Sequence, residues 1–329
     1  MPDDLKKTVE LHRDRTLNDP HSQMRIRAAW LYYVEGNTQS DVAKKLGVNR
    51  IMITRLLSEA KKRGEVVIQI KSKLTSLVQA QTELEEKYGL RKAILAPHAD
   101  ASADPTRVIA AAAGEYVSGL MHHNITVGVG WGRTLHSMLP YIEGQTLKGA
   151  RIVSLLGGIA QARRFNPAEF AWQFAELFDA EGFLVPAPAI VDSPQTKHAL
   201  LEHCGLDRII SMADACDVAL LSCGGITTLT TSYRAGHVSE AERTSLIEAG
   251  AVGDLLYNFL DRDGVPLDHP VNTRNISASV DHLARLPNKV LISGGSEKVE
   301  IIRATLKAIM PGTLITDEVT GAQLLSDTV

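Results

Sequence analysis

Four glycine-rich segments each follow an apolar stretch of the chain, and together they could form a site for a polar ligand. The segments are 127–134 (VGVGWGRT), 155–158 (LLGG), 221–226 (LSCGGI) and 292–298 (ISGGSEK). Glycine lets a ligand approach the backbone closely, and a following helix start supplies unpaired N–H groups. A single such loop often serves only to pack a strand tightly against a helix. Four of them at the ends of strands favour a pocket for a polar ligand.

Side chains in and near these loops could bind hydroxyl groups. A polyol needs hydrogen-bond donors and acceptors: Thr134 offers a hydroxyl, Asp254 could accept, and Lys298 could donate to a hydroxyl or a phosphate. Each assignment has a simpler alternative. Asp254 could cap a helix, Lys298 could be a solvated lysine in a first helical turn, and Trp131 could belong to the core instead of stacking on a sugar.

Catalysis and cofactor binding have weaker support. The segment 127–132 lacks the spacing of a dinucleotide-binding motif, and no GxxxxGK[ST] phosphate loop occurs. The spacing of Cys204, Cys216 and Cys223 does not match a zinc site, and we interpret Cys223 as a small buried thiol. An enzyme remains the alternative function. It would need a general base, for which Asp254 is the strongest candidate. We expect no catalytic residue, no metal and no cofactor.

A second set of candidate residues lies near the N-terminus, where apolar residues recur at helical spacing. The pattern predicts helices over 26–34, 39–46 and 50–63. The residues expected to cap or end these helices are Gly36, Thr38, Gly47, Asn49 and Gly64. A helix, a short glycine turn and a second helix form the helix-turn-helix arrangement, whose second member enters the major groove of DNA.

The third predicted helix has two faces. Its inward face should contain Ile53, Leu56, Leu57 and Ala60. The residues of the module expected to contact DNA are Gln39, Ser40, Asn49, Arg50, Met52, Thr54, Arg55, Ser58, Lys61 and Lys62. The stretch 65–70 should form the wing strand of a winged helix. The simpler alternative is a three-helix bundle that does not bind DNA.

The distribution of charge favours the DNA-binding interpretation. Residues 21–73 carry 11 Lys and Arg against 4 Asp and Glu, or +7, whereas residues 74–329 carry 20 against 29, or −9. Residues 1–20 add −1, which gives the net charge of −3 for the 329-residue chain. A small basic module on a larger acidic body is typical of a protein that binds a polyanion through one part.

The larger body alternates apolar strands with helices, which predicts an α/β fold with a mainly parallel sheet. The strands are expected at 93–96, 125–129, 151–155, 218–222 and 290–293, with helices such as 105–121 and 166–178 between them. The expected domains are a flexible tail (1–20), a helix-turn-helix domain (21–73), a linker helix (74–90) and an effector-binding domain (91–329). The polar N-terminus and the lack of a long apolar run lead us to expect a cytoplasmic protein.

The expected linker helix carries a stripe of residues at spacings of 3 and 4. The residues of this stripe are Leu74, Leu77, Gln81, Leu84 and Tyr88. Because DNA readers often bind as symmetric pairs, we expect the stripe to join two copies of the chain. The alternative is a helix that packs on its own domain.

The motifs in this order and spacing resemble the SorC/DeoR-type family of sugar-binding bacterial transcriptional regulators. The resemblance covers about residues 24–326 and rests on 39–50 (QSDVAKKLGVNR), 128–134 (GVGWGRT), 250–254 (GAVGD), 293–295 (SGG) with Lys298, and 314–318 (LITDE). It implies a winged-helix reader and an effector domain similar to ribose-5-phosphate isomerase and glucosamine-phosphate deaminase. The alternative function is therefore a sugar-phosphate isomerase or deaminase with an attached DNA-binding or dimerising head. It also implies a homotetramer, a sugar or sugar-phosphate effector, operator DNA as partner, and no catalysis.

In the family, effector contacts come from positions that match Arg133, Thr134, Asn166, Asp254 and Lys298. With the glycine loops, the expected effector-binding residues are Gly130, Trp131, Gly132, Arg133, Thr134, Gly157, Gly158, Asn166, Gly224, Gly225, Asp254 and Lys298. One position departs from the family pattern, because Leu156 stands where some members that bind phosphosugars have a basic residue. This departure favours an unphosphorylated sugar or polyol.

Overall fold

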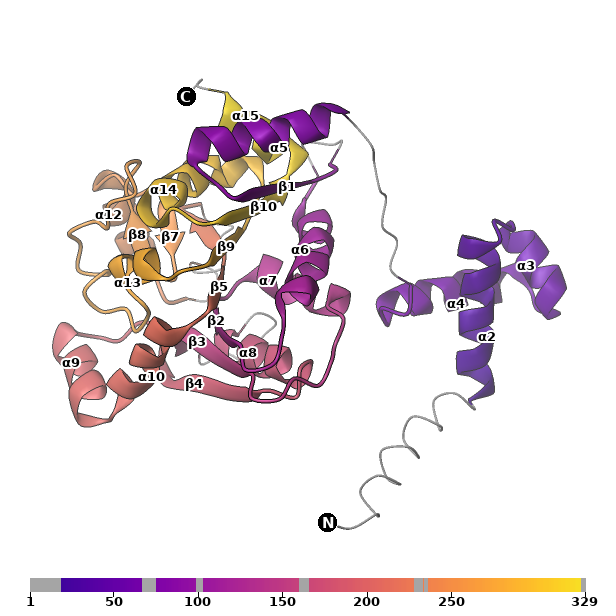
Figure 1. Ribbon diagram of the computed structural model, residues 1–329, viewed down its shortest axis with the longest axis horizontal. Helices are drawn as coiled ribbons and strands as arrows, with labels where there is room; N and C mark the ends of the chain where they lie inside the picture. Colours follow the sequence, from indigo (N-terminus) through magenta and orange to yellow (C-terminus); the bar gives the residue numbers. More distant parts are fainter. Residues whose placement is uncertain are drawn as a thin grey trace, which may run out of the picture. The chain divides into compact units, whose positions relative to one another are not determined.

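The computed structural model describes residues 19–66, 75–98, 103–159, 166–227, 233 and 236–326 (Figure 1). The chain divides into two compact units, Met1–Ile70 and Lys71–Val329, which we describe separately. The tail expected over 1–20 lies outside the described residues except for Asp19 and Pro20. Of the wing strand expected over 65–70, only Glu65 and Val66 are described, and they are not in a strand.

The first unit is a bundle of short helices joined by tight turns. Its elements are α2 (Pro20–Ala29), the π-helical turn η1 (Trp30–Val34), α3 (Gln39–Leu46) and α4 (Arg50–Lys62). Thr38 accepts a hydrogen bond from the N–H of Asp41, and Asn49 Oδ1 accepts one from the N–H of Met52 at 2.8 Å. Gly47 adopts a left-handed conformation with φ 68°. These caps confirm the predicted turn, and the expected inward face of α4 is buried as a whole.

The first helix buries a different face from the one that its apolar residues suggest. Ile26, Trp30 and Val34 are 47%, 58% and 61% exposed, whereas Arg25 is 2% exposed. The π-helical turn shifts the register only of the residues after Trp30, because the N–H of Glu35 bonds to the carbonyl of Trp30, five residues back. Within α2, a buried ion-pair cluster centres on Arg25 and takes up the inward face.

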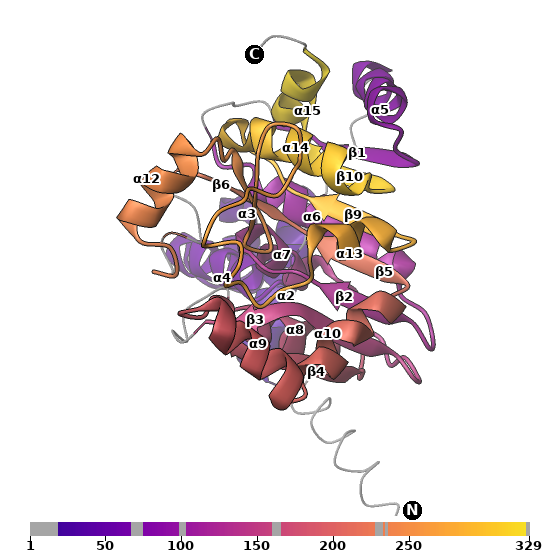
Figure 2. The ribbon, with the colours of Figure 1, turned by 90° about the vertical axis from the view of Figure 1, so that its left-hand side faces the viewer.

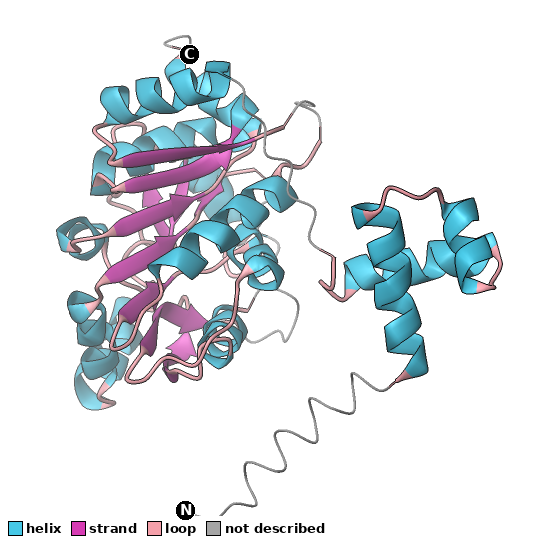
Figure 3. Ribbon diagram, turned by 45° about the vertical axis from the view of Figure 1, so that its right-hand side comes forward, coloured by secondary structure: helices cyan, strands magenta, loops and turns pink. Residues whose placement is uncertain are grey.

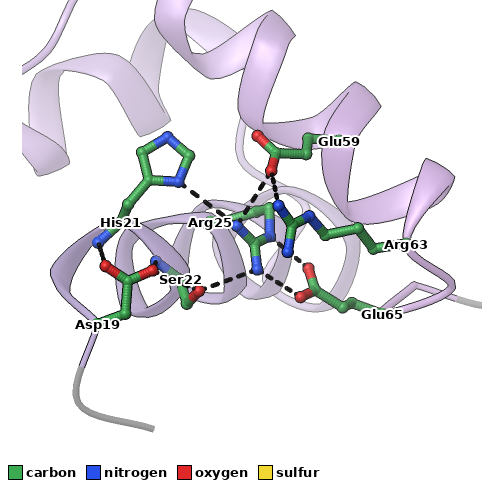
Figure 4. Close-up of polar contacts among 7 residues, drawn as sticks. All are labelled: Asp19, His21, Ser22, Arg25, Glu59, Arg63 and Glu65. Atoms are coloured by element: carbon green, nitrogen blue, oxygen red, sulfur yellow. Dashed lines mark hydrogen bonds and ion pairs between the residues drawn. The ribbon is translucent and has the colours of Figure 1, made fainter. Parts of the chain in front are cut away.

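This cluster joins α2 to the end of α4 (Figure 4). The Arg25 guanidinium donates to both carboxylate oxygens of Glu65, at 2.5 Å each, and to Glu59 at 3.3 Å. It also donates to Ser22 Oγ at 3.1 Å. The pKa of Glu65 is lowered, mainly because its carboxylate accepts these hydrogen bonds from Arg25. A charged side chain therefore takes the place that an apolar residue would occupy.

The second unit is built on a parallel sheet of seven strands. The parallel α/β fold was predicted, but two of these strands, Glu181–Pro188 and Thr313–Asp317, were not. Its strands are β1 (Lys92–Ala96), β2 (Thr126–Val129), β3 (Arg151–Gly158), β4 (Glu181–Pro188), β5 (Val218–Leu221), β9 (Lys289–Ile292) and β10 (Thr313–Asp317). The spatial order is β1-β10-β9-β5-β2-β3-β4, which Figure 2 shows from top to bottom. A second sheet of three antiparallel strands contains β6 (Cys223–Gly225), β7 (Gly253–Leu255) and β8 (Asn258–Leu260).

Helices cover both faces of the parallel sheet (Figure 3). One face carries α6 (Thr106–Leu120), α7 (Arg133–Met138) and α8 (Pro167–Glu176). The other carries α5 (Thr75–Tyr88), α13 (Val280–Arg285), α14 (Val299–Ile309) and α15 (Glu318–Leu325). Further helices are α9 (Pro194–His203), α10 (Leu206–Met212), α12 (Glu240–Glu248) and three 3-10 turns, η2 (Leu139–Tyr141), η3 (Ala213–Ala215) and η4 (Ser296–Lys298). Alternate strand residues enter the two cores, which explains the continuous apolar runs in the sequence.

Two of the four expected glycine loops are strands. Gly157 and Gly158 end β3, and Gly224 and Gly225 lie in β6, paired with β7. A Cβ on Gly157 would lie 2.5 Å from the carbonyl oxygen of Ala187. Glycine is needed there because two backbones approach closely, not because the chain turns.

The stripe on α5 packs within its own unit. Leu77 and Leu84 belong to the core shared with α14 and α15, and Leu84 is fully buried. The Tyr88 hydroxyl donates to the carbonyl of Leu324 at 2.8 Å, and Gln81 accepts from the N–H of Leu95 at 3.1 Å. These four side chains thus support the alternative of a helix that packs on its own unit. Leu74 lies outside the described residues, and the pairing of two copies through this helix stays a prediction. The unit needs Leu77 and Leu84 to cover the edge around β1.

Candidate functional site

The outer side of α3 and α4 presents the residues that were predicted to contact DNA. Nine of these ten side chains are exposed, and Gln39 is half-buried. The Thr54 hydroxyl lies 3.1 Å from Gln39 Oε1, a hydrogen bond that joins the two helices of the helix-turn-helix. Lys61 lies over the ring of Tyr33, with 5.4 Å from Nζ to the centroid. Asn49 already uses its side-chain oxygen as the cap of α4, so only its amide nitrogen is free of that role.

The remaining candidate residues lie near the carboxyl ends of neighbouring strands in the second unit. Strand β2 lies between β3 and β5, and β5 lies beside β9. The segments that follow β2, β5 and β9 therefore leave the same edge of the sheet, where ligands of open α/β folds bind. The N–H of Gly130 donates to the carbonyl of Leu220 at 2.8 Å, which anchors the first of these loops to β5.

An ion pair that the sequence did not predict lies at this edge. Arg133, at the start of α7, is 2.9 Å from Asp104 Oδ2, and both side chains are about half exposed. Burial of the Asp104 carboxyl raises its pKa, but hydrogen bonds from Thr106 and the charges of Arg133 and Lys298 outweigh it and lower the pKa. Asp104 and Arg133 thus form an ion pair that the charge of Lys298 reaches, and we call these three residues the Arg133 cluster. In the sequence, the only sign of this ion pair was that Asp104 directly precedes the helix predicted over 105–121.

Lys298 ends the turn η4 and precedes α14, where it is half-buried. Its charge also acts on the thiol of Cys223, as does the charge of Asp254, so these three side chains share one neighbourhood. The N–H of Gly295 donates to Asp317 Oδ2 at 3.1 Å and to Thr320 Oγ1 at 2.8 Å. This N–H group is thus already satisfied within the protein.

Trp131 and Asp254 are parts of a buried framework. Trp131 is 6% exposed and stacks on Tyr257, with ring centroids 5.1 Å apart and planes at 20°. This contact supports the core alternative for Trp131. Asp254 is 3% exposed in the middle of β7, and its Oδ2 accepts the N–H of Tyr257 at 2.9 Å. It is not the helix cap that the sequence offered as an alternative.

The Asp254 contact fixes the tight turn between β7 and β8. Leu256 and Tyr257 form this turn, with φ of 53° and 61°, a backbone conformation that side chains disfavour. Asn258 Nδ2 donates to the carbonyls of Leu255 and Ala278 at 2.9 Å and 3.1 Å. Burial, and then the charge of Asp254, raise the pKa of Tyr257 well above its ordinary value. Tyr257 thus links this turn to Trp131 through the stacked rings.

Asn166 and Gly158 form a separate pair of candidate residues. Asn166 caps α8 through its Oδ1, which accepts the N–H of Ala168, while its Nδ2 donates to the carbonyl of Ile159. The same Oδ1 would lie 3.8 Å from a Cβ placed on Gly158.

Thr134 is 3% exposed inside α7, and Gly132 precedes that helix with φ 124°.

A hollow of about 540 Å³ lies elsewhere, between α8 and β4. It is lined by Trp172, Ala175, Glu176, Asp179, Ala180, Gly182 and Leu184. None of the predicted effector-binding residues lines it, so the effector pocket at the strand ends stays a prediction.

The possible metal ligands and the three cysteines were the remaining candidates for reactive side chains. Within the described residues, no group of three or more His, Cys, Asp or Glu could hold a metal ion. Cys223 is 4% exposed, which confirms the buried thiol, and burial raises its pKa. Burial also raises the pKa of Cys216 to about 12, whereas Cys204 is exposed at the end of α9. No described helix is long and apolar enough to cross a membrane.

Known proteins share both units of this chain. A family model described as a sugar-binding domain (Sugar-bind) matches residues 72–326. The deoxyribonucleoside regulator of Bacillus subtilis is 31% identical over 308 residues, which are 93% of this chain and 98% of that protein. The erythritol catabolism regulatory protein EryD of Brucella abortus is 29% identical over 309 residues, with the same coverage of 93% and 98%. The structure of the full-length sorbitol operon regulator SorC from Klebsiella pneumoniae is similar, with a TM-score of 0.69 and 24% sequence identity. The match covers 92% of this chain and 99% of that one.

A helix-turn-helix unit joined to an α/β unit defines the chain as a transcriptional regulator, and the alternative of a sugar-phosphate isomerase or deaminase is set aside. The chain belongs to the sugar-binding domain family, in its SorC/DeoR-type group of transcriptional regulators. The expected likeness to isomerase and deaminase folds stays a prediction.

Proposed function

We propose that the protein binds operator DNA through α3 and α4 and releases or retains it according to a small effector bound by the second unit. The proposal for DNA rests on the exposed, mostly polar and basic outer side of a capped helix-turn-helix. Arg50 and Arg55 lie near the start of α4, where side chains reach base edges, and Lys61 and Lys62 lie near its end, where they would meet phosphates. Paired copies, and a cytoplasmic location, belong to the same proposal.

The effector in this proposal is a sugar or polyol. The single observation that carries it is the Arg133 cluster in the segments that follow β1, β2 and β9, in a chain of the sugar-binding domain family. A carboxylate and two cations supply the acceptors and donors that hydroxyl groups need. Because Asp104 offsets part of the positive charge, the cluster suits a neutral polyol better than a phosphate. Asp254, Thr134, Asn166 and the glycines remain proposed contacts.

A thermal-shift screen of sugars, polyols and their phosphates tests the effector. A saturating effector at about 100 times its Kd stabilises the native state by about 2.7 kcal/mol, which raises the melting temperature. We expect a neutral compound to do so, with the shift lost in Lys298→Ala and kept in Lys148→Ala, which removes an exposed lysine outside the cluster. A shift of wild-type size in Lys298→Ala would place the effector elsewhere.

Operator binding is tested on duplexes selected from a random-sequence library by the full-length chain. The Arg50→Ala, Arg55→Ala double variant should bind at least tenfold more weakly, since one base-reading arginine is worth about 1–3 kcal/mol. Arg208→Ala, on the exposed side of α10, is the control and should bind normally. Unchanged affinity in the double variant would remove α4 as the DNA-binding element.

A further inference from the structure

The outer face of α4 contains an isoleucine where its neighbours are polar. Ile51, Arg55, Ser58 and Lys62 recur at spacings of 4, 3 and 4, which places them on one face of the helix. Ile51 is 73% exposed, and in the described part of the chain no other large apolar side chain is more exposed. Since the predicted contact residues were chosen for polarity or length, Ile51 was not among them.

The fold of the first unit does not account for this side chain. The core of the unit contains the opposite face of α4, with Ile53, Leu56 and Leu57, and Ile51 is not part of it. Asn49 caps the helix through its own side chain, so the cap does not need Ile51 either. A β-branched residue is also a slightly poor helix former. Its exposure in the first turn therefore points to a contact outside the chain.

We propose that Ile51 contacts the 5-methyl group of a thymine in the major groove and thereby selects one base pair of the operator. This inference rests on the proposed binding of DNA by α4. The methyl group of thymine is the apolar feature of the major-groove edge, and apolar side chains recognise it. The first turn of the second helix is the part of a helix-turn-helix that reaches the bases.

The charges around Ile51 favour DNA over a protein partner. Arg50 precedes it, Arg55 follows one turn later on the same face, and Lys62 lies further along that face, all exposed. Lys61, close to the end of α4, is exposed as well. A polyanion neutralises these groups while Ile51 meets a base, whereas an apolar protein surface would leave them without counter-charges.

The test removes the methyl group of thymine and the apolar side chain of Ile51 in turn. In the selected operator, each thymine is replaced singly by deoxyuridine, which lacks only the 5-methyl group, and affinity is measured for wild type, Ile51→Ala and Ile26→Ala. We expect one thymine per half-site whose replacement weakens the wild type about fourfold, the ratio for burying one methyl group. In Ile51→Ala this replacement should have no effect, whereas Ile26→Ala, the same substitution on α2, should behave like wild type.

The outcomes separate this inference from the proposed function. If Ile51→Ala keeps full sensitivity to every deoxyuridine replacement, or weakens operator and random DNA equally, Ile51 does not read a thymine. If the Arg50→Ala, Arg55→Ala double variant binds operator normally, the assignment of DNA binding to α4 fails instead, and this inference fails with it.

Discussion

Arg25 illustrates how one side chain can decide which face of a helix is buried. Arg25 lies on α2, and its guanidinium contacts Glu59 on α4 and Glu65, which follows α4. The side chain is almost completely buried. An apolar pattern could not reveal this, because Ile26 and Trp30 look like core residues in sequence. Asp104 and Tyr257 were missed for a similar reason: their partners, Arg133 and Trp131, are distant in the chain and are brought close only by the sheet.

The Arg25–Glu65 pair predicts a pH dependence of the first unit. Because the folded-state pKa of Glu65 lies below its ordinary value of 4.5, the pair contributes stability above about pH 4.5. That contribution is lost as the pH falls towards the lowered pKa. As the pH is lowered, the protection of α4 amides against hydrogen exchange should decrease more steeply in the wild type than in Glu65→Gln. The two proteins are compared at the same pH values. Equal slopes for the two proteins would show that the pair does not carry the effect.

Strands and helices with apolar periodicity were predictable, and glycine-rich segments were not. The five predicted strands all belong to the parallel sheet, and the predicted inward face of α4 is buried. The segments around Gly157 and Gly224 were read as loops because glycine has no side chain to show a period of two. The role of α5 depended on a surface far away in sequence, that of α15, which its own periodicity cannot specify.

The packing of α5 gives a second prediction. Leu84 is fully buried against the second unit, so Leu84→Ala should lower its free energy of unfolding by about 2–5 kcal/mol. Val78→Ala removes a side chain on the same helix that is 60% exposed and should change stability by about 0.5 kcal/mol or less. Urea unfolding and sedimentation measure both effects. A change in oligomeric state without loss of stability in Leu84→Ala would mean that the stripe lies between copies after all.

At the scale of the whole chain, the two units carry opposite charge and opposite tasks in the proposed function. The basic segment 21–73 has a net charge of +7 and the rest of the chain after it −9. The acidic unit repels DNA, so the polyanion is directed to the helix-turn-helix. An effector can then act only by binding one arrangement of the chain more tightly than another.

This coupling must be reciprocal. If the effector found by the thermal-shift screen weakens operator binding by a given factor, saturating operator must weaken effector binding by the same factor, on the order of 5–150-fold in allosteric proteins. Calorimetric titration of the effector, with and without the operator duplex, measures the second factor. Unequal factors would mean that the compound binds the DNA or a different site, not the regulatory one.

The three thiols give the chain a natural site for a chemical label. Maleimides react with the thiolate, and burial raises the pKa of Cys216 and Cys223 and shields both sulfur atoms. Cys204 is exposed at the end of α9, so one equivalent of a dye should attach there first. The unmodified sequence thus offers a single fluorescent reporter on the second unit, without introducing or removing a cysteine.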